Sequence, residues 1–254
     1  MHPISPFKNP TLSWLDVPGF EIDCTLEEYS QQLDATIENT FGCPSNEIKR
    51  MKLFCKLSSR SPKDSFALRR KCEGDFPDDS LAVWTGREAL ELILTSQRVC
   101  EDLERFDYIS PVIMLREWRP CHSHAEFRCF IHSRRLTDVT QYDSSSSVNY
   151  LTQLSSRELV QQLIERFITQ RVFSALKNED YVLDMMLEGV DDFTVADGNA
   201  FCDAVVAGQI TPLVIEVNPF SRKTSGGLFS WMEDARVLLG QDESVLPFEF
   251  RYKS

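Results

Sequence analysis

The chain has 254 residues, which suffices for one large domain or two small ones with a hydrophobic core. Its 39 acidic residues outnumber its 27 basic ones, and the net charge of −12 disfavours non-specific binding to nucleic acid or to anionic lipid. No stretch approaches the roughly 20 apolar residues of a membrane span. From the charge we therefore expect no nucleic-acid partner, and from the missing apolar stretch no membrane segment.

The N-terminal segment, residues 1–24, is rich in proline and aromatic residues without a clear period, and we expect an extended arm. It lacks the basic and apolar regions of a signal peptide, which favours a cytoplasmic protein. A capping box at Thr25–Glu28 predicts the start of a helix, and Gly42 and Pro44 predict its end. The apolar stripe of this helix comprises Leu26, Tyr29, Leu33, Ile37 and Phe41.

A strand, a serine-rich loop and a helix are predicted next. Residues 51–57 alternate between apolar and polar side chains, and the loop SSRSPKDSFAL follows, with Pro62 and Asp64 as turn residues. The hydroxyls and backbone N–H groups of this loop, with Lys56 at the strand end, offer a phosphate site; the alternative is an ordinary surface turn. Residues 85–105 predict an amphipathic helix.

Two further strands are predicted at residues 111–118 and 126–132. In the second strand, alternation places Glu126 and Arg128 on one face. An acid and a base so placed favour a structural ion pair; the alternative is that they bridge a ligand's phosphates and the residues that hold its metal. The opposite face, which we expect in the core, comprises Phe127, Cys129 and Ile131.

The eight cysteines show no CxxC pair and no regular spacing, so we interpret them as reduced packing residues. One stretch crowds cysteine and histidine together and raises the alternative of a zinc site: Cys121, His122, His124, Cys129 and His132. The spacing fits none of the familiar zinc-finger patterns, and Cys129 belongs to an apolar face. Zinc is therefore the weaker interpretation.

The stretch from Tyr181 to Phe220 predicts two paired strands after a long helix that Ser155 caps. YVLDMMLEGV and TPLVIEVNPF are short and apolar, and they flank a polar connection. Because side chains alternate along a strand, Glu216 and Asn218 share one face, and Asp184 lies beside them if the strands form a hairpin. The opposite face of the second strand is expected to carry Leu213, Ile215 and Val217.

Two carboxylates and one amide oxygen on one patch of sheet indicate a cation site. Carboxylates so close repel one another and need a counter-charge, and Mg²⁺ prefers such oxygen ligands. The alternative is a pair of solvated carboxylates on an exposed strand face. After Phe220, the sequence SRKTSGGL predicts a flexible loop with Arg222 and Lys223, followed by a short helix around Ser230–Leu239.

Six sequence blocks stand out in order along the chain: Lys56-Leu57 with Ser61-Pro62-Lys63-Asp64, Leu115–Trp118, Glu126–Phe130, Tyr181–Asp184, Glu216–Phe220 and Leu228–Glu233. Together they resemble the cell division cycle protein 123 family, a branch of the ATP-grasp enzymes. Three features depart from the family pattern: Tyr142 stands where the family has arginine, a serine run replaces a tyrosine-rich stretch, and the N-terminal insert and C-terminal tail are shortened or missing.

The resemblance implies an α+β ATP-grasp fold, in which two lobes with mainly antiparallel sheets clamp ATP and Mg²⁺. It divides the chain into an arm (1–24), an N-terminal lobe (25–110) and a C-terminal lobe (111–254) with the metal site. Its implied nucleotide contacts are Lys56, Ser61, Pro62, Lys63, Asp64, Arg116, Trp118, Glu126 and Arg128. Its implied metal ligands are Asp184, Glu216 and Asn218.

The function implied by the resemblance is that of an assembly factor. The family acts in a chaperone-like manner on eukaryotic translation initiation factor 2 and binds its gamma subunit. We therefore expect a monomeric, ATP- and Mg²⁺-binding assembly factor with this partner. Two alternatives are an ATP-grasp ligase or phosphotransferase that forms an acyl-phosphate on an unknown acceptor, and an interaction module that no longer binds nucleotide. Lys56, Asp184 and Asn218 are all retained, which disfavours the last.

Overall fold

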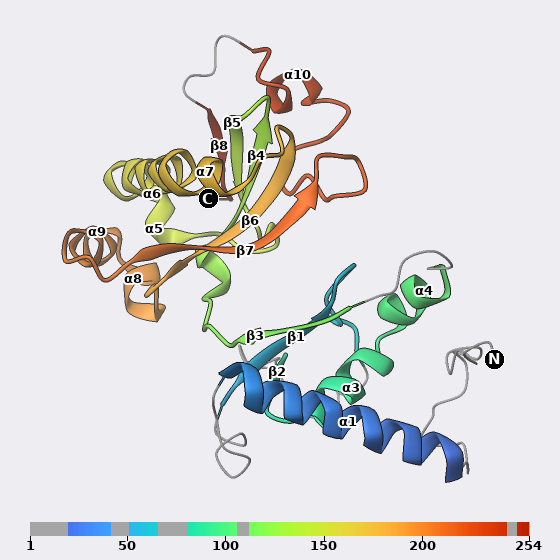
Figure 1. The fold of residues 1–254 in the computed structure, drawn as a ribbon. Coiled ribbons are helices and arrows are strands. Elements are labelled where there is room, and N and C mark those ends of the chain that lie inside the picture. The colour runs from blue at the N-terminus through green and yellow to red at the C-terminus, as the bar shows by residue number, and fades with distance from the viewer. Residues whose placement is uncertain (1–19, 42–50, 66–80, 106–111, 243–247, 254) are drawn as a thin grey trace. The chain divides into compact units, whose positions relative to one another are not determined.

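The computed structural model describes residues 20–41, 51–65, 81–105, 112–242 and 248–253 (Figure 1). The chain divides into two compact units, with the boundary after Pro120. We expected the boundary after residue 110. It lies later because the strand β3 (Ile113–Glu117) pairs along its whole length with β1 (Leu53–Leu57) and so belongs to the first unit.

The first unit packs helices on a small antiparallel sheet with the strand order β2-β1-β3. Its apolar core lies under the β1 face that carries Leu53, Cys55 and Leu57, as alternation along the strand predicts. The helix α1 adds Ile37 to this core. The other elements are α1 (Phe20–Phe41), β2 (Ala82–Val83), α3 (Gly86–Leu94) and α4 (Gln97–Arg105).

Two predictions for the helices of this unit are wrong. The helix α1 begins at Phe20, so Thr25 lies inside it and the predicted capping box does not mark its start. Residues 1–19 of the predicted arm lie outside the described residues. The predicted helix 85–105 is two helices, because the Ser96 side chain accepts a hydrogen bond from the Val99 N–H at 3.2 Å and starts α4 anew.

The second unit is built on a five-stranded sheet with the order β7-β6-β4-β5-β8. All neighbouring strands are antiparallel except β5 and β8, which run parallel. The strands are β4 (Glu126–His132), β5 (Arg135–Gln141), β6 (Tyr181–Glu188), β7 (Thr211–Pro219) and β8 (Glu249–Arg251). The predicted fold class is thus confirmed at the level of a mixed α+β protein with mainly antiparallel sheets.

Helices cover one face of this sheet, as Figure 1 shows for α6 and α7. The large core under them contains Phe127, Cys129 and Ile131, which confirms the predicted core face of β4. Ile164 and Phe201 contribute to it from two of the helices. The helical segments are a 3₁₀ turn (Ser123–Ala125), α5 (Asn149–Thr152), α6 (Leu154–Phe167), a π-helical turn (Ile168–Val172), α7 (Phe173–Ala175), α8 (Asp192–Ala196) and α9 (Gly198–Val206).

The other face of the sheet carries a smaller apolar cluster under the segment that follows β7. Phe130 on β4 packs edge-on against Phe229 and Trp231, with ring centroids 5.7 Å and 5.6 Å away. The segment ends in the short helix α10 (Ala235–Leu238), and Leu238 belongs to the same cluster. Polar residues share this sheet face, and the candidate site lies among them.

Candidate functional site

Asp184 lies near the middle of β6, the strand between β7 and β4. Its side chain is buried, and only 2% of the residue is exposed. A buried carboxylate is costly unless a charged partner neutralises it. Arg128, opposite on β4, is that partner: its Nε donates to Oδ1 and its Nη2 donates to Oδ2, each at 2.8 Å. The two residues form a bidentate ion pair within the sheet.

The predicted pairing of the two strands around Asp184 is confirmed. The strands β6 and β7 are antiparallel, with Asp184 opposite Glu216 and Val182 opposite Asn218. The Asn218 amide Nδ2 donates to Asp184 Oδ2 at 2.9 Å, and Glu216 is half-buried beside it. Asp184, Glu216 and Asn218 therefore lie together on one patch of the sheet, and their role as metal ligands stays a prediction.

The predicted faces of β7 are wrong on the N-terminal side of Glu216. The register shifts between Asp184 and Met185, so that Met185 pairs with Val214 and leaves Ile215 as an extra residue. Such a β-bulge reverses the alternation that follows it. Leu213 consequently pairs with Met186, on the Asp184 face, and Val214 packs against the helix-covered core.

The lone pairs of Asp184 decide how a cation would fit this patch. An ionised carboxylate has about four acceptor positions. Oδ2 accepts from both Arg128 and Asn218, and Oδ1 accepts from Arg128, so the described residues leave one position on Oδ1. Asn218 engages Asp184 through its nitrogen, which leaves its oxygen for another partner. Asp184 Oδ1, Asn218 Oδ1 and the Glu216 carboxylate make a hard-oxygen set that fits Mg²⁺.

Arg128 contacts two further groups besides Asp184. Its Nη1 donates to the backbone carbonyl of Ser225 at 2.7 Å, and its guanidinium lies 4.9 Å from the centroid of the Tyr142 ring. Burial acts to lower the pKa of Arg128, but the hydrogen bonds and charge of Asp184 outweigh it and raise the pKa above its ordinary value. The sequence paired Arg128 with Glu126 on the same strand face, whereas the structure pairs its guanidinium with Asp184 on the neighbouring strand β6.

Three of the predicted nucleotide contacts in the first unit share one face of its sheet. Arg116 on β3 lies opposite Phe54, with its guanidinium 4.6 Å from the ring centroid. The rings of Phe54 and Trp118 lie 6.3 Å apart, and Lys56 is two residues further along β1. This face combines two cations with two aromatic rings, whereas the opposite face of β1 lies in the core.

The loop after β1 serves a structural purpose at Asp64. The Asp64 carboxylate accepts hydrogen bonds from Ser96 Oγ at 2.5 Å and from the Arg98 N–H at 3.0 Å, and so caps α4. Partial burial acts to raise the pKa of Asp64, but these hydrogen bonds hold it below its ordinary value. Pro62 is buried in the turn, which leaves the half-buried Ser61 and the exposed Lys63 at the surface. The alternative of an ordinary turn is thus favoured for Asp64 and Pro62.

The cysteines and histidines around residue 121–132 do not assemble a zinc site. Within the described ranges, no three or more His, Cys, Asp or Glu side chains are grouped to hold a metal ion. His122 contacts Asp192 at 3.1 Å, His124 contacts Ser146 at 3.1 Å, and Cys129 is fully buried in the core. The weaker interpretation therefore gains no support.

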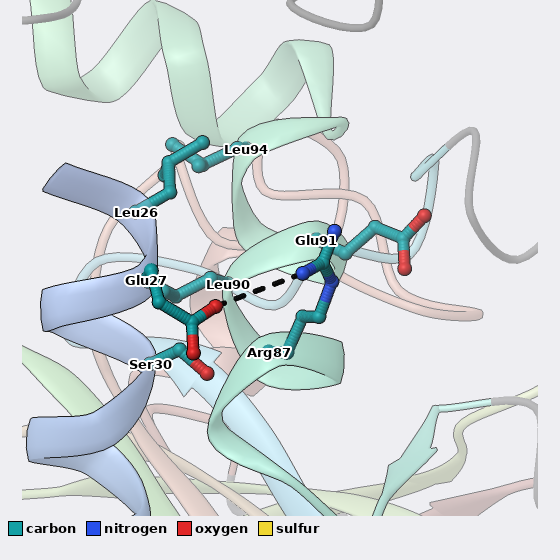
Figure 2. A pocket seen from close by; sticks show the side chains of 7 residues that line it. All are labelled: Leu26, Glu27, Ser30, Arg87, Leu90, Glu91 and Leu94. Atoms are coloured by element: carbon teal, nitrogen blue, oxygen red, sulfur yellow. Dashed lines mark ion pairs between the residues drawn. The ribbon is translucent and has the colours of Figure 1, made fainter. Parts of the chain in front are cut away.

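A hollow of about 240 Å³ lies elsewhere, between α1 and α3 of the first unit (Figure 2). Leu26, Leu90 and Leu94 line it, and a 3.7 Å ion pair between Glu27 and Arg87 crosses it. It contains no predicted site residue and is smaller than the roughly 300–1,000 Å³ typical of ligand pockets. We therefore place the candidate site at Asp184 and not in this hollow.

Comparison with known proteins decides the family. The sequence model of the D123 family matches residues 27–252. The chain belongs to the D123 family. A relative from Yarrowia lipolytica, 27% identical over 154 residues, is named cell division cycle protein 123, and the match covers 58% of this chain and 39% of that protein. The predicted family resemblance is confirmed.

Several relatives of this D123 protein are named translation initiation factor eIF2 assembly proteins. The protein of Candida albicans is 22% identical over 223 residues, 82% of this chain and 53% of the relative. That of Schizosaccharomyces pombe is 28% identical over 193 residues, 70% of this chain and 50% of the relative. The chain thus spans about half the length of the curated relatives it matches.

The fold of this D123 protein resembles solved structures of Cdc123 from Schizosaccharomyces pombe. The C-terminally truncated form matches with a TM-score of 0.64 and 22% identity, over 94% of this chain and 84% of that one. A second structure matches with a TM-score of 0.60 and 24% identity, over 90% and 79%. At this identity the match establishes the shared fold. In the described part of the chain, no helix has the length and apolar character needed to cross a bilayer.

Sequence reasoning missed two groups at the site, Tyr142 and the Ser225 carbonyl. Tyr142 stood out only as a departure from the family pattern, and its ring now lies against Arg128. Ser225 belongs to a segment with no strand or helix pattern, so nothing in the sequence placed its carbonyl near β4. The glycines that follow it were the available signal, because they allow the backbone to approach the sheet closely.

Proposed function

We propose that this D123 family member is an ATP- and Mg²⁺-binding assembly factor for eukaryotic translation initiation factor 2, acting through the gamma subunit. Family membership over residues 27–252 carries the proposal, since several matched relatives are named assembly proteins of this factor. The ATP-grasp fold expected from the sequence is part of the same proposal. The chain spans about half of those relatives, so the experiments that test its activity use this chain itself.

The Asp184 patch supports the Mg²⁺ half of the proposal. Glu216 and Asn218 would hold the ion together with the remaining lone pair of Asp184. When bound, Mg²⁺ would neutralise negative charge on the phosphates of the nucleotide. Arg128 holds Asp184 in place from the neighbouring strand β4, as neighbours of metal ligands commonly do.

The outer face of the first unit's sheet supports the nucleotide half. Lys56 and Arg116 offer positive charge to phosphates, and Phe54 and Trp118 offer aromatic surface to a base. Lys63 is exposed on the adjoining loop and is the further cation proposed for the phosphates. Glu126, half-buried at the start of β4, is proposed to line the site.

A second candidate function is that of an ATP-grasp ligase or phosphotransferase. A transferase needs groups that face an acceptor, and the exposed pair Arg222 and Lys223 follows directly on the strand that carries Glu216 and Asn218. Release of phosphate or adenosine monophosphate in the presence of an acceptor would favour this function over the assembly role.

The first expected result concerns nucleotide binding. ATP with Mg²⁺ at about 100 times its Kd should stabilise the chain by about 2.7 kcal/mol, because a ligand that binds only the folded state shifts the unfolding equilibrium. For a chain of this size that corresponds to a rise in melting temperature of about 5–10 °C. Differential scanning fluorimetry at millimolar ATP measures it, with ATP plus EDTA as the comparison.

Variants sharpen this measurement. Glu216→Gln keeps the volume of the side chain but removes its charge, and should abolish most of the Mg²⁺-dependent rise. Lys56→Met removes a cation that is proposed to contact the phosphates and should also reduce the rise. Asp203→Asn removes an exposed carboxylate from α9 and should leave the rise intact. No rise in the wild-type chain would contradict the nucleotide site.

The second expected result concerns the partner. The purified chain should form a complex with the isolated gamma subunit of initiation factor 2, but not with the alpha or beta subunit, in size-exclusion chromatography. The acidic chain, with a net charge of −12, should bind more weakly as salt screens its charge if the partner surface is basic. Binding to none of the three subunits would contradict the assembly role while leaving the nucleotide site to stand on the thermal measurement.

A further inference from the structure

The segment after β7, residues 221–231, is held to the sheet at several points; we call it the 221–231 loop. The Trp231 indole donates to the Thr224 carbonyl at 2.6 Å, and the Thr224 hydroxyl donates to the Pro219 carbonyl at 2.7 Å. The Leu228 N–H donates to Thr140 Oγ1 on β5 at 3.3 Å. The flexible loop that the sequence predicts is therefore a tethered one.

The middle of this loop lies directly on the sheet. Gly227 has a φ of +62°, and a Cβ atom there would lie 2.5 Å from the Thr140 methyl carbon. Only a residue without a side chain allows this approach. The loop backbone is thus brought within reach of Arg128, which lies opposite Thr140 in the β4–β5 register.

We propose that Arg128 is a positioning residue that joins the buried carboxylate of Asp184 to the 221–231 loop, so that the two act as one element. A single guanidinium donates two hydrogen bonds to Asp184 and a third to the Ser225 carbonyl. Its planar fork is fixed by the first two bonds, so the directions of the Nη1 N–H groups are fixed as well, and Nη1 donates to the loop. The Tyr142 ring packs against the same guanidinium.

This link connects the interior of the site with its surface. The loop exposes Arg222 and Lys223, the two cations that a second function would use toward an acceptor. The position of these two cations depends on where the Ser225 backbone lies. Arg128 holds that backbone, and the charge of Asp184 fixes the orientation of Arg128. The inference rests on the proposed function in one respect only, namely that Asp184 belongs to a ligand site; the link itself is independent of any ligand.

Hydrogen exchange of the loop amides, measured without nucleotide, tests the link. The reporters are the Leu228 and Phe229 amides, which donate to Thr140 Oγ1 and to the Gly226 carbonyl. Arg128→Lys keeps the charge but loses the planar fork that bonds Asp184 and Ser225 together, and should speed exchange at both amides about tenfold. Asp184→Asn does not touch the loop and should speed it similarly, because it weakens the hold on Arg128.

A matched control separates the link from general loosening. Asn218→Ala also removes a hydrogen bond to Asp184 but does not touch Arg128, and should leave the loop amides unchanged. Exchange of the core amides of α6 reports global stability in every variant. The link is overturned if Asp184→Asn leaves the loop amides unchanged, or if Asn218→Ala speeds them as much as Asp184→Asn does. Failure of ATP to stabilise the wild-type chain would contradict the proposed function without affecting this outcome.

Discussion

Replacing Asp184 with alanine should lower the free energy of unfolding by about 3–5 kcal/mol, one of the two largest effects expected from this structure. Asp184 is 2% exposed and Arg128 is 7% exposed, so the substitution leaves a buried guanidinium without its acid. An uncompensated buried charge costs far more than the net contribution of the pair it came from. Urea unfolding followed by circular dichroism measures the loss.

The double variant Asp184→Ala with Arg128→Met provides the decisive comparison. Methionine fills a similar volume without charge, and replacing a buried pair with apolar side chains is often neutral or stabilising. The double variant should therefore recover most of the stability that the single variant loses. Asp203→Asn, on the surface of α9, serves as the charge-matched control and should change stability by less than about 0.5 kcal/mol. A loss below about 1 kcal/mol in Asp184→Ala would mean that the pair is not buried as described.

Because Asp184 supports both stability and the proposed ligand site, its alanine variant cannot separate the two. Glu216 is half-buried, and within the described residues its strand β7 lies at the edge of the sheet. Its glutamine variant should therefore affect ligand binding with little effect on folding. The structure makes Glu216 and Asn218 the sharper probes of the proposed metal site.

The second large effect is expected at Asp138, on β5. It is 0% exposed, and neither of its carboxylate oxygens has a hydrogen-bond partner among the described residues. Glu249 lies opposite on β8, and Arg251 is engaged with Asp234 and Glu249. Burial above all, with the nearby charges of Glu249 and Asp234, raises the pKa of Asp138 to about 7, although the Thr137 hydroxyl and Arg251 act in the opposite direction.

Because its pKa is raised in the folded state, Asp138 lowers the free energy of unfolding by an amount that depends on pH. Below about pH 4 the carboxyl group is protonated in both states and contributes nothing. As pH rises from about 4 to about 7, the unfolded chain loses the proton and the folded chain keeps it, so stability falls; above pH 7 the loss is complete. Between pH 5 and pH 8 the loss amounts to about 2–3 kcal/mol.

Asp138→Asn should remove this dependence, because asparagine does not titrate. The difference in unfolding free energy between variant and wild type should rise by about 2–3 kcal/mol from pH 5 to pH 8, in favour of the variant. Urea unfolding across this pH range measures the difference, and any constant cost of burying the amide cancels from the slope. A flat difference would show that Asp138 is ionised in the folded protein throughout.

Much of the site was predictable because alternation along a strand is a local property. It placed Phe127, Cys129 and Ile131 in the core, and it placed Asp184 with Glu216 and Asn218. It failed where the chain contains one residue too many: the bulge at Ile215 reverses the faces of Leu213 and Val214, and nothing in an apolar run marks such an insertion.

The missed elements have physical reasons of their own. The strand β5 carries buried polar residues, among them Asp138 and Thr140, so its sequence lacks the alternation of apolar and polar residues that predicts a strand. The short helices α8 and α9 follow Asp191 and Asp197, whose side chains cap them, but five and nine residues give too few turns for a clear period. Arg128 could be paired only with its sequence neighbour Glu126, because strand order is a tertiary property.

The ion pair at the centre of the sheet joins residues 56 positions apart in the chain, and the hydrogen bond from Asn218 spans a further 34 positions. During synthesis β4, which carries Arg128, leaves the ribosome long before β6 and β7 have been made. Contacts between residues so far apart in the chain cost entropy before they stabilise the fold, so β4 and β6 should pair late. The protein therefore acquires its candidate site only once its own folding is complete.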